Sequence, residues 1–392
     1  MNRKIFTRAV WIVSIVSLLT DISSEMLYPV MPVYLKSIGF SVLLIGLLEG
    51  LAEAIAGLSK GYFGKLSDVT GKRVPFVRLG YLMSSLSKPM LAMFVYPLWI
   101  FFARTIDRFG KGLRTSARDA ILSEESTPEN KGKIFGFHRG MDTLGAVLGP
   151  VAALIYLDFY PENYRTLFLF AFIPAIAAVS FTFLLKDKKT DTLPVKEKVK
   201  FFSFSGHWKE SNPEYKKLVT GLFIFTLLNS SDIFLLLMVK NLGFSDQKVI
   251  MVYIFYNLVY ALASLPVGIL ADKIGLKNNY IAGLIIFAIV YGGMALNPGI
   301  ETVFFLFFCY GIYAASTEGI SKAWITNISE KSKTATALGF YNGFNSIFSL
   351  IASVLAGFLW YSFGPEIMFA FSSAGTIATV IYFLVSFRKL KA

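Results

Sequence analysis

The sequence predicts an all-α membrane protein with about twelve transmembrane helices in two pseudo-symmetric six-helix bundles. Three observations predict this class. The chain has 392 residues, of which 55% are hydrophobic, and its mean hydropathy is +0.60. Apolar segments of about 20 residues, the length that crosses a bilayer as a helix, recur along it. The two halves of the sequence also resemble each other, which indicates a duplicated unit.

The predicted spans form two sets of six on either side of a polar segment. They lie near residues 9–36, 42–65, 74–95, 97–122, 133–157, 164–186, 216–240, 247–271, 279–297, 301–327, 335–361 and 366–387. We therefore predict an N-terminal bundle over residues 1–186, a Lys-rich linker over 187–215 and a C-terminal bundle over 216–392. In the linker, Phe201 to Trp208 is expected to form a short interfacial helix, and the lysines are expected near anionic lipid headgroups.

Basic residues gather at alternate ends of the spans, as the positive-inside rule requires. The segments assigned to the cytoplasm carry Arg3, Lys4, Arg8, Lys65, Lys72, Arg73, Lys131, Lys133, Lys273, Lys277, Lys331, Lys333, Arg388, Lys389 and Lys391. The protein is therefore predicted to lie in the inner (cytoplasmic) membrane, with both termini in the cytoplasm. The first apolar run contains acids and has no small-residue cleavage site, so we interpret it as a retained span and not as a signal peptide.

Composition argues against several function classes. A single cysteine, Cys309, rules out a disulfide framework, and two histidines give no zinc constellation. The chain contains no GxxxxGK[ST] phosphate loop, which argues against ATP-driven pumping. The net charge of +13 follows the membrane topology, so no nucleic-acid partner is expected. We predict that the chain is not an enzyme and that it has no cofactor and no metal site.

The internal repeat keeps one register across loops. The segment KSIGFS at 36–41 recurs as KNLGFS at 240–245, and GKLSDVTGK at 64–72 recurs as GILADKIGLK at 268–277. Both pairs are 204 residues apart. Repeat-built membrane folds place their substrate sites near the midplane, where the repeats meet.

A loop motif follows the second span. Its residues Gly64, Asp68, Gly71 and Arg73 fit the pattern G-x-L-x-D-x-x-G-x-K/R, and this segment resembles the signature loop of the major facilitator superfamily. The glycines allow a tight turn at the membrane surface, and the aspartate can accept hydrogen bonds from a base or a helix N-terminus. The second copy carries Gly268, Asp272 and Gly275. The resemblance implies that these residues act in conformational change.

A further segment of the fifth span, Gly145 to Pro150, resembles the antiporter-associated element of that superfamily. Its small-residue spacing allows close helix approach. The resemblance points to the drug/proton antiporter branch, in which an arginine of the fourth span is linked to proton coupling. Here either Arg104 or Arg108 matches that arginine.

The fourth predicted span carries a stripe of charge. At about 100° per residue, its charged side chains share one face, while apolar residues take the other. The stripe consists of Arg104, Asp107, Arg108, Lys111, Arg114 and Arg118. A base at the bilayer centre costs about 3 kcal/mol on insertion scales, so the stripe must face water, substrate or acids. It is predicted to line a polar pathway; the alternative is an ion-pair network that only locks helices together.

Acidic residues of the first two spans are the counterpart of the stripe. Asp21, Glu25 and Tyr28 share one face of the first span, and Glu49 and Glu53 share a face of the second. The four carboxyl groups are candidate proton carriers, because burial raises the pKa of a carboxyl group and a neighbouring arginine lowers it. Permanent pairing with an arginine is the alternative for each of them.

Other polar side chains complete the candidate site. His138, Arg139 and Asp142 are interpreted as a structural ion-pair cluster and not as a proton relay. Tyr28 and the four bases Arg104, Arg108, Lys111 and Arg114 are candidate substrate contacts. The second half contributes the further candidates Asp232, Asn257, Glu318, Lys322, Trp324 and Asn345.

These residues predict a secondary active transporter that works by alternating access, with proton-coupled efflux of a small organic solute. One alternative is uptake or exchange of an anionic solute such as an organic anion, a phosphate ester or a siderophore-like chelate. A second alternative is a non-transporting membrane receptor or assembly factor. The expected partners are the solute, protons and membrane lipids, and the protein is expected to be a monomer.

Overall fold

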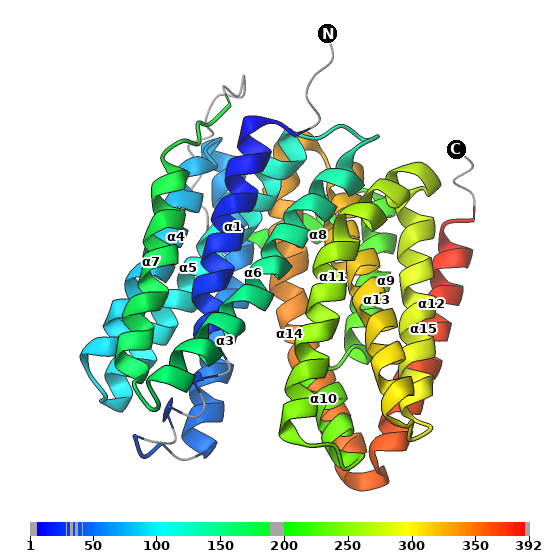
Figure 1. The fold of residues 1–392 in the computed structure, drawn as a ribbon. Coiled ribbons are helices and arrows are strands. Elements are labelled where there is room, and N and C mark those ends of the chain that lie inside the picture. Colours follow the sequence, from blue (N-terminus) through cyan, green and yellow to red (C-terminus); the bar gives the residue numbers. More distant parts are fainter. Residues whose placement is uncertain are drawn as a thin grey trace. The chain divides into compact units, whose positions relative to one another are not determined.

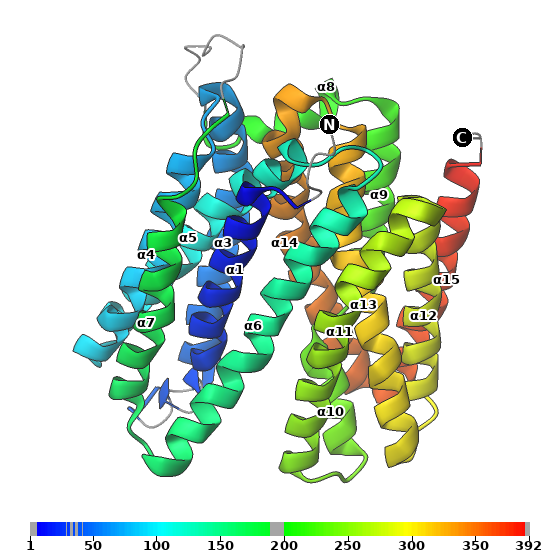
Figure 2. The same cartoon turned by 45° about the horizontal axis from the view of Figure 1, so that its top comes forward.

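A computed structural model describes residues 6–28, 30–31, 34–35, 38–40, 42–188 and 200–388, without the side chains of 42–54, 246–247 and 250. Within these ranges all regular structure is helical (Figures 1 and 2). The α-helices are α1 Arg8–Leu27, α3 Val42–Thr70, α4 Val74–Met93, α5 Pro97–Glu124, α6 Lys131–Phe159, α7 Tyr164–Thr182, α8 His207–Glu210, α9 Pro213–Leu228, α10 Asp232–Asn241, α11 Asp246–Ile274, α12 Leu276–Met294, α13 Ile300–Ile328, α14 Thr334–Phe363 and α15 Pro365–Ser386. Two short 3₁₀ helices, η1 Ser203–Gly206 and η2 Lys331–Lys333, join them.

Several helices begin at sequence signals that favour a helix start. Pro97, Pro213 and Pro365 stand at the first positions of α5, α9 and α15, where a missing N–H is harmless. Asn212 caps α9, because its side chain accepts a hydrogen bond of 2.7 Å from the backbone N–H of Tyr215. The predicted spans correspond in order to α1, α3 to α7, α9 with α10, and α11 to α15.

The chain forms two compact units. Unit 1 comprises residues 1–127, 141–210 and 330–346. In it α4 packs against α5 and α7, α3 against α5, and α1 against α7 (Figure 2). One apolar cluster of this unit includes Leu27, Leu35 and Phe168.

Unit 2 comprises residues 128–140, 211–329 and 347–392. In it α13 packs against α11 and α12, and α15 packs against α12 and α9. Its core is aromatic: the rings of Phe287 and Tyr291 stack with centroids 3.9 Å apart, and Phe225 meets Phe287 edge-on at 5.1 Å. Boundaries between the units also fall inside α6 and α14, so the predicted division at 187–215 stays a prediction.

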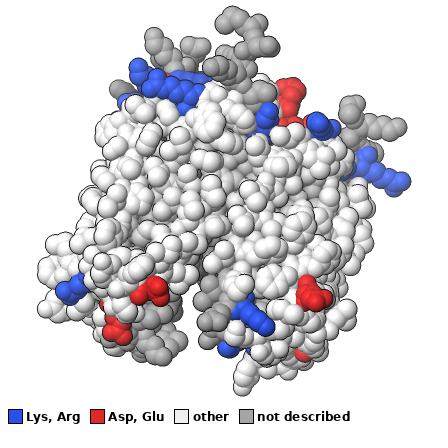
Figure 3. Space-filling view, in the orientation of Figure 1, with Lys and Arg blue, Asp and Glu red and all other residues white. Residues whose placement is uncertain are grey.

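The apolar helices fit a membrane. Eight helical segments among the described residues are long and apolar enough to cross one. Helix α5 is not among them, because its charged residues lower its hydropathy. Five of these side chains are buried inside unit 1: Arg104, Asp107, Arg114, Arg118 and Asp119. On the face in Figure 3, the charged side chains of each unit gather near the helix ends, and an uncharged band separates them. The predicted all-helical membrane fold is confirmed.

The linker packs on unit 1 through aromatic rings. Where the sequence predicts a short helix, η1 and α8 follow each other from Ser203 to Glu210. Phe204 is buried, and the ring of Trp208 stacks on that of Phe340 with centroids 5.8 Å apart. Contact of the linker with lipid headgroups stays a prediction.

Candidate functional site

The loop motif holds the first turn of α14. Asp68, in the last turn of α3, accepts hydrogen bonds from the backbone N–H of Thr336 at 2.5 Å, from its hydroxyl at 2.6 Å and from the N–H of Ala335 at 3.3 Å. A carboxylate at a helix N-terminus satisfies unpaired N–H groups and meets the positive end of the helix dipole. Asp68 therefore fixes the start of α14 to the end of α3.

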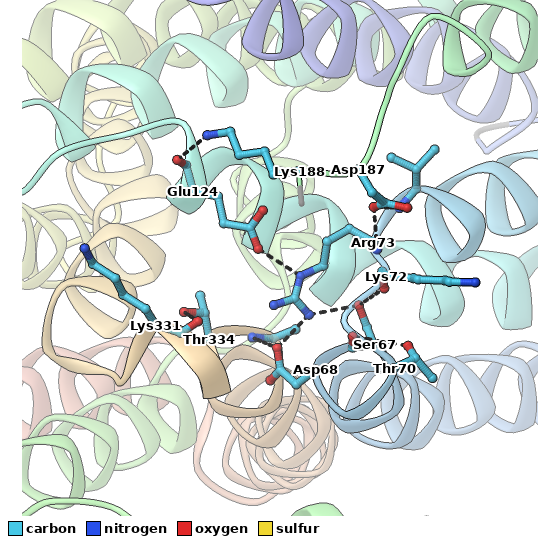
Figure 4. Close-up of polar contacts among 12 residues, drawn as sticks. Ser67, Asp68, Thr70, Lys72, Arg73, Glu124, Asp187, Lys188, Lys331 and Thr334 are labelled. Carbon is cyan, nitrogen blue, oxygen red and sulfur yellow. Dashed lines mark hydrogen bonds and ion pairs between the residues drawn. The ribbon is translucent and has the colours of Figure 1, made fainter. Parts of the chain in front are cut away.

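Arg73, the basic residue of the loop motif, lies beside Asp68 (Figure 4). Its guanidinium lies 2.6 Å from the carboxylate of Asp68 and 3.0 Å from that of Glu124, and it donates to the hydroxyl of Ser67 at 3.0 Å. The chain between Asp68 and Arg73 turns at Gly71, whose φ of 63° favours glycine. The arginine thus joins the ends of α3 and α5 around the motif aspartate.

The second motif copy repeats the cap in unit 2 without the arginine. Asp272 accepts hydrogen bonds from the N–H groups of Gly132 at 2.7 Å and Lys133 at 2.8 Å, in the first turn of α6. Gly275 has a φ of 90° and ends α11. Lys277 donates to the carbonyl of Phe387 at 3.2 Å. Each motif aspartate therefore caps one helix, but only the first copy adds an ion pair with an arginine.

Gly64 and Gly268 occupy corresponding places in the two caps. A Cβ at Gly64 would collide with the carbonyl oxygen of Ala335, and one at Gly268 with that of Gly132. The backbones approach too closely there for any larger residue. The conformational role of the motif residues stays a prediction.

The stripe on α5 meets a lysine that sequence reasoning missed. Lys88 on α4 is buried and forms an ion pair of 3.0 Å with Asp107. Its amino group also lies 3.4 Å from the hydroxyl of Ser24 on α1. A lysine in the middle of an apolar span, directly before Pro89, was the available signal.

The other bases of the stripe differ in exposure. Arg114 is buried, donates to the hydroxyl of Ser84 at 2.6 Å and lies 4.4 Å from the centre of the Tyr81 ring. Arg104 is also buried, Arg108 is partly buried and Lys111 is exposed. The end of the stripe near Arg114 is therefore packed into the unit, while Lys111 remains accessible.

The acids of α1 lie near this stripe. Asp21 and Glu25 are partly buried, and Tyr28 is exposed. The carboxyl of Glu25 is within electrostatic reach of Lys111 and Arg108. The side chains of the other two candidate carriers, Glu49 and Glu53, lie outside the described part of the structure.

Of the three residues interpreted as an ion-pair cluster, His138 and Arg139 belong to unit 2 and Asp142 belongs to unit 1. Arg139, in unit 2, lies 3.6 Å from the carboxylate of Glu318 and donates to the hydroxyl of Tyr260. Asp142, in unit 1, lies 3.9 Å from the guanidinium of Arg118. His138 is buried.

In unit 2 the polar centre is built around Asp232. This residue begins α10, directly after the break from α9, and it accepts hydrogen bonds of 2.6 Å from each of the hydroxyls of Tyr256 and Tyr310. Asn229, at the end of α9, donates to the hydroxyl of Tyr313 at 3.0 Å. A broken membrane helix with a polar residue at the break is typical of transporter binding sites. Sequence reasoning did not single out Tyr310.

The remaining candidate contacts are dispersed. Asn257 is buried and donates to the carbonyl of Tyr253 at 3.0 Å. Trp324 packs among the rings of three residues, Tyr280, Phe383 and Phe387. Glu318 is exposed, while Lys322 and Asn345 are partly exposed. Their part in substrate binding stays a prediction. Among the described residues, no group of three or more His, Cys, Asp or Glu side chains is placed to hold a metal ion.

Comparison with known proteins gives matches over nearly the whole chain. The model of the Major Facilitator Superfamily matches residues 13–239 and 218–391. An MFS-type transporter of Methanocaldococcus jannaschii is 35% identical over 389 residues, which cover 98% of this chain and 96% of that one. A multi-drug resistance efflux pump PmrA homolog of Lactococcus lactis is 23% identical over 94% of this chain and 92% of its own. The crystal structure of the human organic anion transporter MFSD10 (TETRAN) matches with a TM-score of 0.78 and 15% identity, over 96% of this chain and 99% of that one.

Proposed function

Since the chain belongs to the major facilitator superfamily, we propose that it is a secondary active transporter that exports a small organic solute in exchange for protons. The observation that carries the proposal is the pair of carboxyl groups on α1. Asp21 and Glu25 lie in electrostatic reach of Lys111 inside a membrane-spanning unit. A carboxyl in such a place can exchange a proton when its access to water or to a neighbouring cation changes. Full-length similarity to the Lactococcus efflux pump supports export.

A second candidate function is transport of an anionic solute. The specific observation in its favour is the concentration of bases on α4 and α5, where Lys88, Arg104 and Arg114 are buried and Arg108 is partly buried. Guanidinium groups suit carboxylate and phosphate ligands, because they donate two parallel hydrogen bonds. The human structural neighbour is an organic anion transporter, which agrees with this reading.

Transport in proteoliposomes under an imposed pH gradient tests the first proposal. A thermal-shift screen of purified protein first selects a solute from a panel of organic cations, anions and neutral compounds. Adding this solute should then move protons across the vesicle membrane. Asp21→Asn and Glu25→Gln should transport the solute without proton movement. Transport by the wild type that is indifferent to the pH gradient would refute proton coupling.

The same vesicles separate the two candidates. Arg108→Gln should weaken transport of an organic anion such as fluorescein and spare a cation such as ethidium if the anion reading holds. Equal loss for both solutes would point to a structural effect of the substitution.

We also propose the cellular arrangement that the positive-inside rule favours. The chain resides as a monomer in the cytoplasmic membrane, with both termini and the loop motif on the cytoplasmic side. The caps made by Asp68 and Asp272 would then lie on the cytoplasmic side, where the motif residues would act in the conformational change. Labelling of engineered cysteines at either end of α3 in intact cells tests the orientation.

A further inference from the structure

Helix α10 begins after a break in the seventh predicted span. Asn229 is the C-cap of α9, residues 229–231 are not helical, and Asp232 is the first residue of α10. Ser231 caps α10, because its hydroxyl accepts a hydrogen bond of 3.4 Å from the N–H of Ile233. The carboxylate of Asp232 does not serve as the cap and contacts other groups instead.

Two hydroxyl groups from neighbouring helices hold this carboxylate. Tyr256 on α11 donates to its Oδ2 atom and Tyr310 on α13 donates to its Oδ1 atom, each at 2.6 Å. Distances of about 2.5–2.7 Å between the oxygens are typical of a hydrogen bond from a hydroxyl to a charged carboxylate. With one donor on each oxygen, Asp232 is held as an anion in a fixed orientation.

The charge of Asp232 has no base beside it. Among the side chains that the structure describes, no ion pair includes Asp232, and Arg139 of the same unit pairs with Glu318 at 3.6 Å. In unit 1, by contrast, Asp107 has Lys88 at 3.0 Å. An ionised carboxyl group inside a membrane helix is costly without a positive partner, so the site at Asp232 favours a cation from outside the chain.

Asn229 offers a hydrogen-bond acceptor at the same break. Its amide nitrogen donates to the hydroxyl of Tyr313 at 3.0 Å, whereas its buried Oδ1 atom accepts no hydrogen bond from any described residue. A buried acceptor without a donor is unfavourable. The break therefore lacks both a positive charge and a hydrogen-bond donor, and an ammonium group supplies the two together.

Aromatic rings pack beside both groups. The ring of Tyr310 packs against those of Tyr256 and Tyr313, with centroid distances of 5.4 and 5.2 Å. Tyr253 meets Tyr256 edge-on at 5.5 Å and is only partly buried. Aromatic rings attract organic cations and provide apolar surface for their carbon skeleton. These surroundings favour an organic ammonium over a bare metal ion.

We propose that the break between α9 and α10 binds the ammonium group of an organic cation. The carboxylate of Asp232 pairs with the positive charge, and Oδ1 of Asn229 accepts an N–H hydrogen bond. Tyr256 and Tyr310 position the carboxylate. Asp232 is partly exposed, in keeping with a site that a solute enters. This inference rests on the proposed export of an organic solute and identifies that solute as a cationic amine.

Equilibrium binding to the full-length protein in lipid nanodiscs tests the site without transport. The probes are dansylcadaverine, which carries a primary ammonium group, its neutral N-acetyl derivative, and its trimethylammonium analogue, which keeps the charge but has no N–H on that group. Fluorescence anisotropy gives each affinity after subtraction of the signal from empty nanodiscs. The wild type should bind the primary amine roughly tenfold more tightly than the acetyl derivative, or better.

Two substitutions separate the charge from the hydrogen bond. Asp232→Asn should weaken binding of both cations by roughly 30-fold and leave the neutral derivative unchanged. Asn229→Ala should weaken only the primary amine, by roughly tenfold, because the quaternary analogue has no N–H to donate. Asp232→Glu retains the charge and should still prefer the cations over the neutral derivative, which separates a lost charge from a damaged fold.

Glu366→Gln is the matched control. Glu366 is also an acid in the first turn of a helix of unit 2, α15, and it accepts a hydrogen bond of 3.0 Å from Asn297. This variant should bind all three probes as the wild type does.

The binding and transport assays together give distinct outcomes. Absence of amine binding, equal wild-type affinity for the amine and its acetyl derivative, or unchanged amine binding in Asp232→Asn would overturn the site. If binding depends on Asp232 but the vesicles show no proton-coupled export, the site stands and the proposed function fails. Coupled export of the amine by Asp232→Asn with wild-type affinity would support the function and refute the site.

Discussion

The two motif copies provide a matched pair of substitutions. Asp68→Asn removes a carboxylate that caps α14 and also pairs with Arg73 at 2.6 Å. Asp272→Asn removes a carboxylate that caps α6 through two backbone N–H groups only. We predict that the first change loosens its helix start much more than the second.

The free-energy cost of each substitution depends on the groups that it leaves without a partner. Breaking a buried ion pair costs about 3–5 kcal/mol. Arg73 keeps Glu124 and Ser67 as partners, so we expect the lower end of that range for Asp68→Asn. Asp272 is held by backbone N–H groups, and an asparagine there keeps one acceptor oxygen. Asp272→Asn should therefore cost about 1.5 kcal/mol, the lower value for a hydrogen bond to a charged group. The difference corresponds to roughly a tenfold change in local opening.

Amide hydrogen exchange measures this opening directly. In Asp68→Asn, peptides that cover the first turn of α14 should exchange roughly 100-fold faster, while the start of α6 keeps its wild-type rate. In Asp272→Asn, the start of α6 should exchange roughly tenfold faster. Equal acceleration in the two variants, or none at α14 in Asp68→Asn, would show that the ion pair with Arg73 contributes nothing to the cap.

Three further predictions concern residues of unit 1. Lys88→Met leaves Asp107 buried without its ion-pair partner, and it should lower the unfolding free energy by about 3–5 kcal/mol in detergent, whereas adding Asp107→Leu should recover most of the loss. Phe204→Ala should cost about 3–5 kcal/mol in the same assay, because the buried ring fills the space beside Gly61 of α3. Burial and the nearby Lys333 lower the pKa of His207 to about 4. The neutral imidazole is therefore the folded form, and stability should fall as the pH drops from about 6.5 towards 4. His207→Gln should remove this part of the pH dependence of thermal unfolding.

Hydrophobic periodicity describes the faces of a single helix. The sequence therefore predicts which residues share a face, but not which helices pack against each other. The charged face of α5 follows from spacing alone, because every residue of the stripe belongs to one helix. The ion pair between Lys88 and Asp107 joins two helices, and no local pattern states which neighbour meets a given face. The partner of the motif aspartate shows the same limit. A helix N-terminus or a base was expected at Asp68, but the first turn of α14 lies 268 residues away in the chain.

The two units satisfy their buried acids by different means, and this bears on where a proton can be exchanged. In unit 1, Asp107 and Asp142 lie beside bases, so a change in access alters a balance between charges. In unit 2, Asp232 is held by the hydroxyls of Tyr256 and Tyr310, which are neutral donors. Neutral donors fix the orientation of a carboxylate and stabilise its charge without offering a competing cation. Under the proposed function, we therefore expect proton exchange against a fixed positive charge in unit 1 and recognition of the solute by the tyrosine hydroxyls in unit 2.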